Sequence, residues 1–288
     1  MALRWSRVAP QIALAPATIV TLTAFIGAIL WSVYLSFSAS RRFPDYAIVG
    51  FKQYQRLFND SGWVVSLENM VILGVGSLLT IVFGFLLAAL IDREVAGTPI
   101  FRTIFLYPLA VSLIVTGISW RWLFNPTLGV ENLLHSLGWT SANFNWLNSP
   151  STVMYGIILG VVWQSTGFYM ALMLAGLRGI NIEIWQAARL DGVPFWRLYI
   201  EVIIPMMKLT FITAILLLSI GVVKAYDIIV AMTNGGPGGS SWVPAYFVIQ
   251  AYWVKNNLGF ASAAATIMLL LTALLFTPVI IFRRRSST

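Results

Sequence analysis

Cysteine is absent from this chain of 288 residues, and histidine occurs once, at His135. Without thiols there are no disulfides, thiolate nucleophiles or cysteine-ligated metals, and one imidazole leaves little for a metal site. We interpret His135 as a loop or interface side chain. Charge is scarce as well, since only 10% of the residues are Asp, Glu, Lys or Arg, compared with about 25% in soluble domains.

Apolar residues dominate the composition. They account for 59% of the chain and give a mean hydropathy of +0.83, so lipid must surround most of it. The net charge of +8 comes from short basic clusters between long apolar runs, which is typical of loops at a membrane surface and argues against nucleic-acid binding. The composition therefore predicts an all-α, multi-pass integral membrane protein.

Runs of about 20 apolar residues are long enough to cross a bilayer as helices. Six such runs predict transmembrane helices at 12–37, 67–91, 103–124, 152–177, 209–231 and 261–282. The first run is too long in its apolar part for a cleaved signal peptide, so we expect it to be a retained helix. We expect one transmembrane domain over residues 1–288, whose longest cytoplasmic loop is 178–208.

Basic residues are distributed unevenly between alternate loops. Residues 125–150, on the poorer side, contain no Lys or Arg. Lys and Arg near helix ends tend to stay on the cytoplasmic side, so we expect both chain ends in the cytoplasm. The richer side collects Arg4, Arg7, Arg93, Arg102, Arg178, Arg189, Arg197, Lys208, Arg283, Arg284 and Arg285.

Two other functional classes have less support. A membrane-embedded transferase needs clustered carboxylates or histidines, but the 10 acidic residues are scattered without an obvious pair. An ion-coupled transporter that works alone usually has more helices or paired internal halves, and no clear inverted repeat is visible. The phosphate-binding pattern GxxxxGK[ST] is also absent, so any ATP must be bound by another chain.

The long cytoplasmic loop predicts a rigid, bent element. Residues 183–190 favour helix, Gly192 suits the position that ends it, and Pro194 can open a second helix leading into the membrane. Small side chains at Ala187 and Ala188 leave a shallow surface that a partner can approach closely.

The same loop carries Gln186-Ala187-Ala188, then Gly192, then Val202-Ile203-Ile204-Pro205. This spacing resembles the EAA loop of ABC-importer permeases, although that family usually has Glu at the position of Gln186. The resemblance implies six helices in the type I importer architecture, a place in the cell (inner) membrane, and a coupling helix that docks on a separate ATPase. The implied coupling residues are Glu183, Gln186, Ala187, Ala188, Asp191 and Gly192.

A second stretch reads Lys224-Ala225-Tyr226-Asp227 and continues to Thr233-Asn234-Gly235-Gly236-Pro237. It is similar to a signature of carbohydrate-importer permeases of the maltose and glycerol-phosphate type. This similarity implies a pore-forming subunit that performs no covalent chemistry and holds no cofactor. The implied partners are a second homologous permease, two ATPase subunits that bind ATP and Mg, an extracytoplasmic solute-binding protein, a carbohydrate and membrane lipid.

Three ionisable residues, Arg121, Lys224 and Asp227, stand at membrane depth. Each requires a partner or a watery cavity, because a charge in the bilayer costs at least about 2.5–3.5 kcal/mol. Lys224 and Asp227 lie three positions apart, so on one helix they either satisfy each other or line the solute path. We interpret Arg121 as an interfacial anchor or, alternatively, as a residue that attracts an anionic sugar.

Polar and aromatic residues interrupt the fourth apolar run near its middle. Sugars bind to flat rings combined with a few hydrogen-bonding groups. By resemblance, Gln164, Ser165 and Phe168 correspond to sugar contacts of a maltose permease. The alternative is that Ser, Thr and Gly here only permit close helix packing. The expected solute path comprises Trp163, Gln164, Ser165, Phe168, Lys224, Tyr226 and Asp227, and the sugar stays open between α-glucosides, anionic derivatives and others.

Overall fold

The computed structural model describes residues 13–92 and 97–285, with side chains as far as residue 277. The described residues are mostly helical, and their one β feature is an isolated antiparallel bridge between Ser38 and Ile48. Several residues used in the predictions lie outside this description, namely Arg4, Arg7, Ile12 and Arg93, together with the side chains of Arg283, Arg284 and Arg285.

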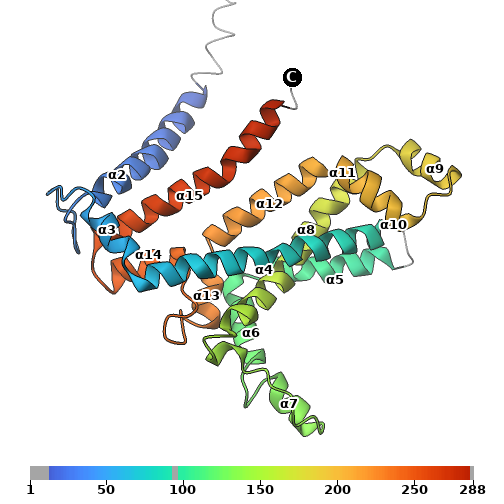
Figure 1. The fold of residues 1–288 in the computed structure, drawn as a ribbon, viewed down its shortest axis with the longest axis horizontal. Coiled ribbons are helices and arrows are strands. Elements are labelled where there is room, and N and C mark those ends of the chain that lie inside the picture. Colours follow the sequence, from blue (N-terminus) through green and yellow to red (C-terminus); the bar gives the residue numbers. More distant parts are fainter. Residues whose placement is uncertain (1–12, 93–96, 286–288) are drawn as a thin grey trace, which may run out of the picture. The chain divides into compact units, whose positions relative to one another are not determined.

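The longest helices are α4 (Ser61–Ile91), α8 (Val153–Arg178) and α15 (Leu258–Arg285) (Figure 1). With the helix Ala13–Ser36, whose last part is α2 (Gly27–Ser36), they give four candidate membrane spans by length and composition. Two bent pairs of helices raise the number to six among the described residues if each pair counts as one span. This agrees with the six apolar runs in the sequence.

The third predicted run, 103–124, is not one continuous helix. α5 (Thr98–Ala110) and α6 (Leu113–Leu123) meet at an angle of 99°. Pro108 weakens the end of α5 because it has no N–H to donate. Ser112 then starts α6 as its N-cap, since its hydroxyl accepts a hydrogen bond from the N–H of Val115 at 3.3 Å.

The fifth predicted run, 209–231, is also divided. α12 (Lys208–Val223) ends before Lys224, and α13 (Asp227–Met232) begins with a carboxylate in its first turn, where the helix dipole favours negative charge. The expectation that Lys224 and Asp227 share one helical face is therefore wrong. No ion pair joins them, although both residues are described.

Shorter elements connect the long helices. α3 (Lys52–Phe58) precedes α4, α7 (Val130–Ser136) and the turn η2 (Trp146–Asn148) precede α8, and α14 (Pro244–Trp253) precedes α15. Between α8 and α12 lie α9 (Ile182–Leu190), α10 (Phe195–Leu198), η3 (Tyr199–Ile203) and α11 (Ile204–Met206). The segment Phe195–Met206 meets α12 at 71°, which agrees with the expected end of the long loop near residue 208.

The chain separates into two compact units. In the first, Trp63, Phe247 and Phe260 are completely buried, and the rings of Trp63 and Phe247 meet edge-on with centroids 5.2 Å apart. The first unit comprises the described parts of Met1–Trp63 and Phe247–Leu270, and the second comprises the described parts of Val64–Tyr246 and Leu271–Thr288.

Close helix packing on glycines holds the second unit together. A Cβ atom on Gly167 of α8 would lie 2.0 Å from the carbonyl oxygen of Phe105 in α5. A Cβ atom on Gly84 of α4 would lie 2.8 Å from the backbone of Tyr169 and Met170 in α8. Only hydrogen fits at such contacts, so the packing interpretation holds for these glycines.

Candidate functional site

A cavity of about 340 Å³ lies within the second unit. Its volume falls in the range usual for small-molecule sites, about 300–1,000 Å³. Residues of α4, α6, α8, α12 and α13, together with the joint between α12 and α13, form its walls. Its polar lining residues are Ser77, Thr80, Ser165, Tyr169, Lys224, Tyr226 and Asp227.

Helix α8 turns one face toward this cavity. Val161, Ser165 and Tyr169 all line it, and their spacing of four places them on one side of the helix. Of the four solute-path residues predicted on α8, Ser165 is therefore the one that lines the cavity. Trp163 is 44% exposed and meets Trp120 edge-on at 6.1 Å, outside the cavity lining.

The other two predicted α8 residues point elsewhere. Phe168 is 37% exposed and lies outside the cavity lining. Gln164 is buried, and its Nε2 donates a hydrogen bond to the carbonyl oxygen of Val111 at 2.8 Å. Val111 lies at the break between α5 and α6, where backbone groups lose their helical partners. Gln164 thus stabilises the joint between α5 and α6. The two bonded residues lie far apart in the sequence, so hydropathy could not predict this contact.

The joint between α12 and α13 brings Lys224, Tyr226 and Asp227 to the cavity wall. Lys224 and Asp227 are both exposed, and neither forms an ion pair within the described chain. The two charges therefore remain available to a solute or to water. This arrangement favours the solute-path interpretation of the pair over mutual neutralisation.

A second aromatic ring packs against the ring of Tyr226. The ring of Tyr246 stacks on that of Tyr226 with centroids 6.1 Å apart and an interplanar angle of 29°. The buried hydroxyl of Tyr246 donates to the carbonyl oxygen of Asn234 at 2.8 Å. The glycine-rich turn that begins at Asn234 is thereby linked to a residue of the cavity wall.

Asn69 of α4 holds the other end of this glycine-rich turn. Its buried Nδ2 donates to the carbonyl oxygens of Ser240 and Trp242, each at 2.8 Å. The turn has no room for a side chain at Gly235, because a Cβ there, at φ +81°, would come within 2.6 Å of the Tyr246 ring. Asn69 and Tyr246 together hold the two ends of the turn in place within the second unit.

Sequence analysis missed the contribution of α4. Ser77 and Thr80 line the cavity, and Asn69 lies on the same side of the helix because the spacing approximates whole turns. Three small polar residues on one face of an otherwise apolar run were a detectable signal. Serine and threonine in apolar helices also serve packing, so the pattern alone could not decide between the two roles.

The loop at 178–208 folds much as predicted. α9 begins after Asn181, whose side chain accepts a hydrogen bond from the N–H of Glu183 at 3.1 Å. It ends at Leu190, and Gly192 follows in the left-handed region with φ +64°. Figure 1 shows α9 beyond the C-terminal end of α8, followed by α10.

The predicted coupling residues divide between two sides of α9. Ala188 is only 9% exposed, so it packs against its own chain and adds nothing to the expected shallow surface. Leu190, which sequence analysis did not select, is 88% exposed. The exposed members of the predicted set are Glu183, Gln186, Ala187, Asp191 and Gly192.

An open cavity of about 840 Å³ lies behind α9. Trp185 and Ala188 of α9 contribute to its wall, as do Arg178 and Asp92, which form an ion pair at 3.6 Å. Because of this cavity, α9 is not packed against the rest of the chain along its whole inner side.

Comparisons with known proteins identify relatives of this chain. A family model described as "binding-protein-dependent transport system inner membrane component" matches residues 80–287. A probable ABC transporter permease protein of Pyrococcus horikoshii is 36% identical over 257 residues, covering 87% of each chain. A xylose/arabinose import permease protein of Haloferax volcanii is 30% identical over 237 residues, covering 80% of this chain and 73% of the relative.

Similarity extends to a solved structure. A chain from a bacterial ABC transporter involved in the import of the acidic polysaccharide alginate superposes with a TM-score of 0.85. The alignment covers 99% of this chain and 98% of the other, at 18% sequence identity. At that identity the likeness establishes the fold.

Proposed function

The chain belongs to the family of inner membrane components of binding-protein-dependent transport systems, and we propose that it lines the path of a sugar or sugar derivative through an ATP-driven importer. One observation carries the proposal: a single helix, α8, runs from the wall of the cavity to the exposed segment that contains α9. Ser165 lies on the cavity wall, and Arg178, the last residue of α8, leads into that segment.

The cavity has the chemistry that a sugar requires. Tyr169 and Tyr226 offer ring surfaces, whereas Ser165, Lys224 and Asp227 offer hydrogen-bond donors and acceptors. The xylose/arabinose import permease of Haloferax volcanii supports a carbohydrate as the transported solute. We therefore assign these five residues to the solute path.

We assign the exposed side of α9 to docking on a separate ATPase subunit, in which ATP and Mg are bound. A leucine that is 88% exposed at the end of α9 loses water-exposed apolar surface when a partner covers it. Leu190 has Gln186 one helical turn before it and Asp191 directly after it, both exposed. Apolar contact at Leu190 with polar contacts around it is the usual anatomy of a protein interface.

A second permease subunit is the proposed partner within the membrane. The apolar window of Ala13–Ser36 is 0% buried by the chain itself. A second homologous subunit and lipid together would cover such a helix. We propose two ATPase subunits below this pair and a solute-binding protein on the extracytoplasmic side.

Movement in this scheme passes along α8. ATP-driven closure of the ATPase subunits displaces α9, and the continuous helix Val153–Arg178 transmits the displacement to the cavity wall. Rigid-body tilting of this kind opens a central site alternately to the two sides of a membrane. The chain itself performs no covalent step.

The experiment is uptake by the reconstituted complex. Carbohydrates are first screened by thermal shift of the cognate solute-binding protein, and the best ligand is then offered, radiolabelled, to proteoliposomes with ATP inside and outside. We expect uptake that needs ATP, the binding protein and the ATPase subunits together. Uptake by this chain without an ATPase subunit would contradict the proposal, as would a binding protein that recognises no carbohydrate.

A further inference from the structure

We propose that the side-chain hydroxyl of Ser77, on α4, forms a hydrogen bond with the transported solute in the cavity. This inference rests on the proposed function and adds a residue from a helix that neither the motifs nor the family resemblance indicated. Ser77 lines the cavity and is 2% exposed. Its Oγ has no hydrogen-bond partner among the described residues.

The neighbouring hydroxyl on the same helix behaves differently. Thr80 also lines the cavity, but its Oγ1 donates to the backbone carbonyl oxygen of Ser77 at 2.7 Å. Thr80 therefore satisfies its donor within α4, as serine and threonine commonly do in helices. Ser77 leaves its hydroxyl free, although it stands in the same helix and faces the same cavity.

A buried hydroxyl without a partner is costly, because it has lost its hydrogen bonds to water. A ligand that enters the cavity and bonds to Ser77 removes that cost. The hydroxyl both donates and accepts, so it matches the hydroxyl groups of a sugar in either role. Leu73, Val161 and Leu218 line the same cavity and suit the apolar faces of a sugar ring.

The absence of cysteine allows a direct test of this position. Ser77→Cys introduces a single thiol, which is treated in membrane vesicles with a water-soluble methanethiosulfonate reagent and then counted by mass spectrometry. The matched control is Leu79→Cys, on the same helix but 45% exposed and outside the cavity lining. We expect Ser77→Cys to react at least about tenfold faster than Leu79→Cys.

Uptake kinetics then test the contact with the solute. The probe is the carbohydrate identified with the binding protein. We expect Ser77→Ala to raise the concentration for half-maximal uptake about threefold to tenfold, the change that follows from one neutral hydrogen bond. Ser77→Thr, which retains a hydroxyl, should recover most of this loss. ATPase activity without solute and the amount of assembled complex should not change.

Each outcome has a distinct meaning. Slow labelling of Ser77→Cys, equal to the control, would overturn the inference. Fast labelling with unchanged uptake by Ser77→Ala would also overturn it, because Ser77 would then contact only water. If Ser77→Cys reacts quickly but the wild-type complex imports no carbohydrate, the proposed substrate class fails, while the placement of Ser77 at a watery cavity stands.

Discussion

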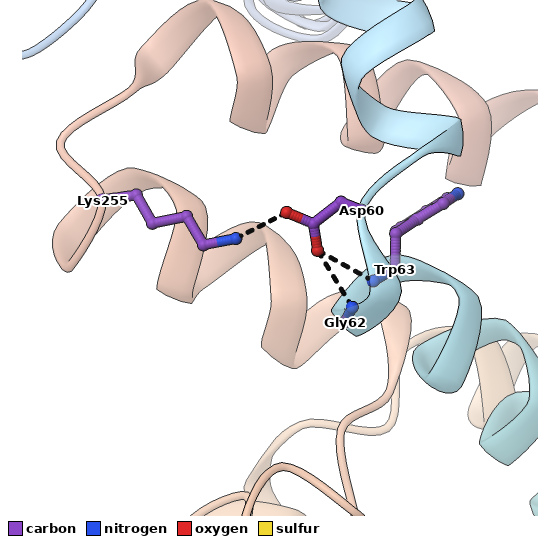
Figure 2. Close-up of polar contacts among 4 residues, drawn as sticks. All are labelled: Asp60, Gly62, Trp63 and Lys255. Carbon is purple, nitrogen blue, oxygen red and sulfur yellow. Dashed lines mark hydrogen bonds and ion pairs between the residues drawn. The ribbon is translucent and has the colours of Figure 1, made fainter.

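Lys255 and Asp60, 195 positions apart in the sequence, form an ion pair with 2.9 Å between Nζ and Oδ2 (Figure 2). The other carboxylate oxygen of Asp60 accepts hydrogen bonds from the N–H groups of Gly62 at 3.0 Å and Trp63 at 3.3 Å. Asp60 is therefore the N-cap of α4. One carboxylate both starts a membrane helix and fixes the connection between α14 and α15 in the first unit.

Substitutions at Asp60 should separate these two roles. Asp60→Asn retains a good helix cap but loses the ion pair, so we expect a loss of about 0.5–1 kcal/mol, as is usual for a partly exposed pair. Asp60→Ala loses both interactions, and we expect about 1.5–3 kcal/mol. The measurement is thermal unfolding of the purified protein in detergent.

Lys255→Met supplies the control for the ion pair. Its long apolar side chain keeps contact with the ring of Phe247, over which Nζ of Lys255 lies at 5.1 Å. We expect Lys255→Met to resemble Asp60→Asn, and the double variant to be little worse than either. Equal effects of Asp60→Asn and Asp60→Ala would show that the cap contributes nothing.

A charge at Leu190 should separate the permease from its ATPase. Leu190→Glu places a carboxylate where we propose an apolar contact, so the amount of ATPase that copurifies should fall at least about tenfold. Leu190→Met keeps the apolar character and should copurify normally. Because Leu190 is 88% exposed, neither substitution should lower the melting temperature of the isolated chain. Normal copurification of the ATPase with Leu190→Glu would show that Leu190 does not lie at the interface.

Gln164 should prove important for stability, not for solute affinity. Gln164→Leu removes the donor to the carbonyl oxygen of Val111, and the loss of this partly buried hydrogen bond costs about 0.5–1.5 kcal/mol. We expect a lower melting temperature and an unchanged half-saturation concentration in the surviving complex. The reverse result, normal stability with weakened uptake, would contradict this prediction. It would show that Gln164 contacts the solute, as the family resemblance implied.

Asn69 should act on the cavity through the glycine-rich turn. Asn69→Ala removes two hydrogen bonds to carbonyl oxygens, which frees the turn and, through Tyr246, the wall residue Tyr226. We expect Ala225→Cys, which lines the same cavity and keeps the Tyr226 ring, to label at least about threefold faster when Asn69→Ala is also present. Tyr155→Cys, 60% exposed near the start of α8, serves as a reference thiol whose labelling should not respond.

Hydropathy predicted the straight spans well. The runs 67–91 and 152–177 correspond to α4 and α8, because a long apolar segment in lipid satisfies its backbone only as a helix. The bent pairs were not predicted, because composition says nothing about direction. The 99° bend depends on Ser112 and on Gln164, which lies 53 positions away from Val111.

Motif spacing predicted the local fold around α9 more completely than the cavity. Gly192 adopts the left-handed conformation that its place after α9 indicated. Lys224 and Asp227 were found from their charge, but their relation depended on a helix end that the apolar pattern conceals. Ser77 belongs to a polar face of α4 that the sequence shows, but its role follows from a missing hydrogen bond, which only the folded structure reveals.

The central claim is that α9 meets a separate ATPase on the cytoplasmic side, and a crosslink tests it most directly. A photocrosslinker is attached to the single thiol of Gln186→Cys in the assembled complex, with Leu137→Cys, 74% exposed in the segment before α8, as the matched control. The account predicts a crosslink to the ATPase from Gln186→Cys and none from Leu137→Cys. A crosslink to the ATPase from Leu137→Cys, with none from Gln186→Cys, would contradict it.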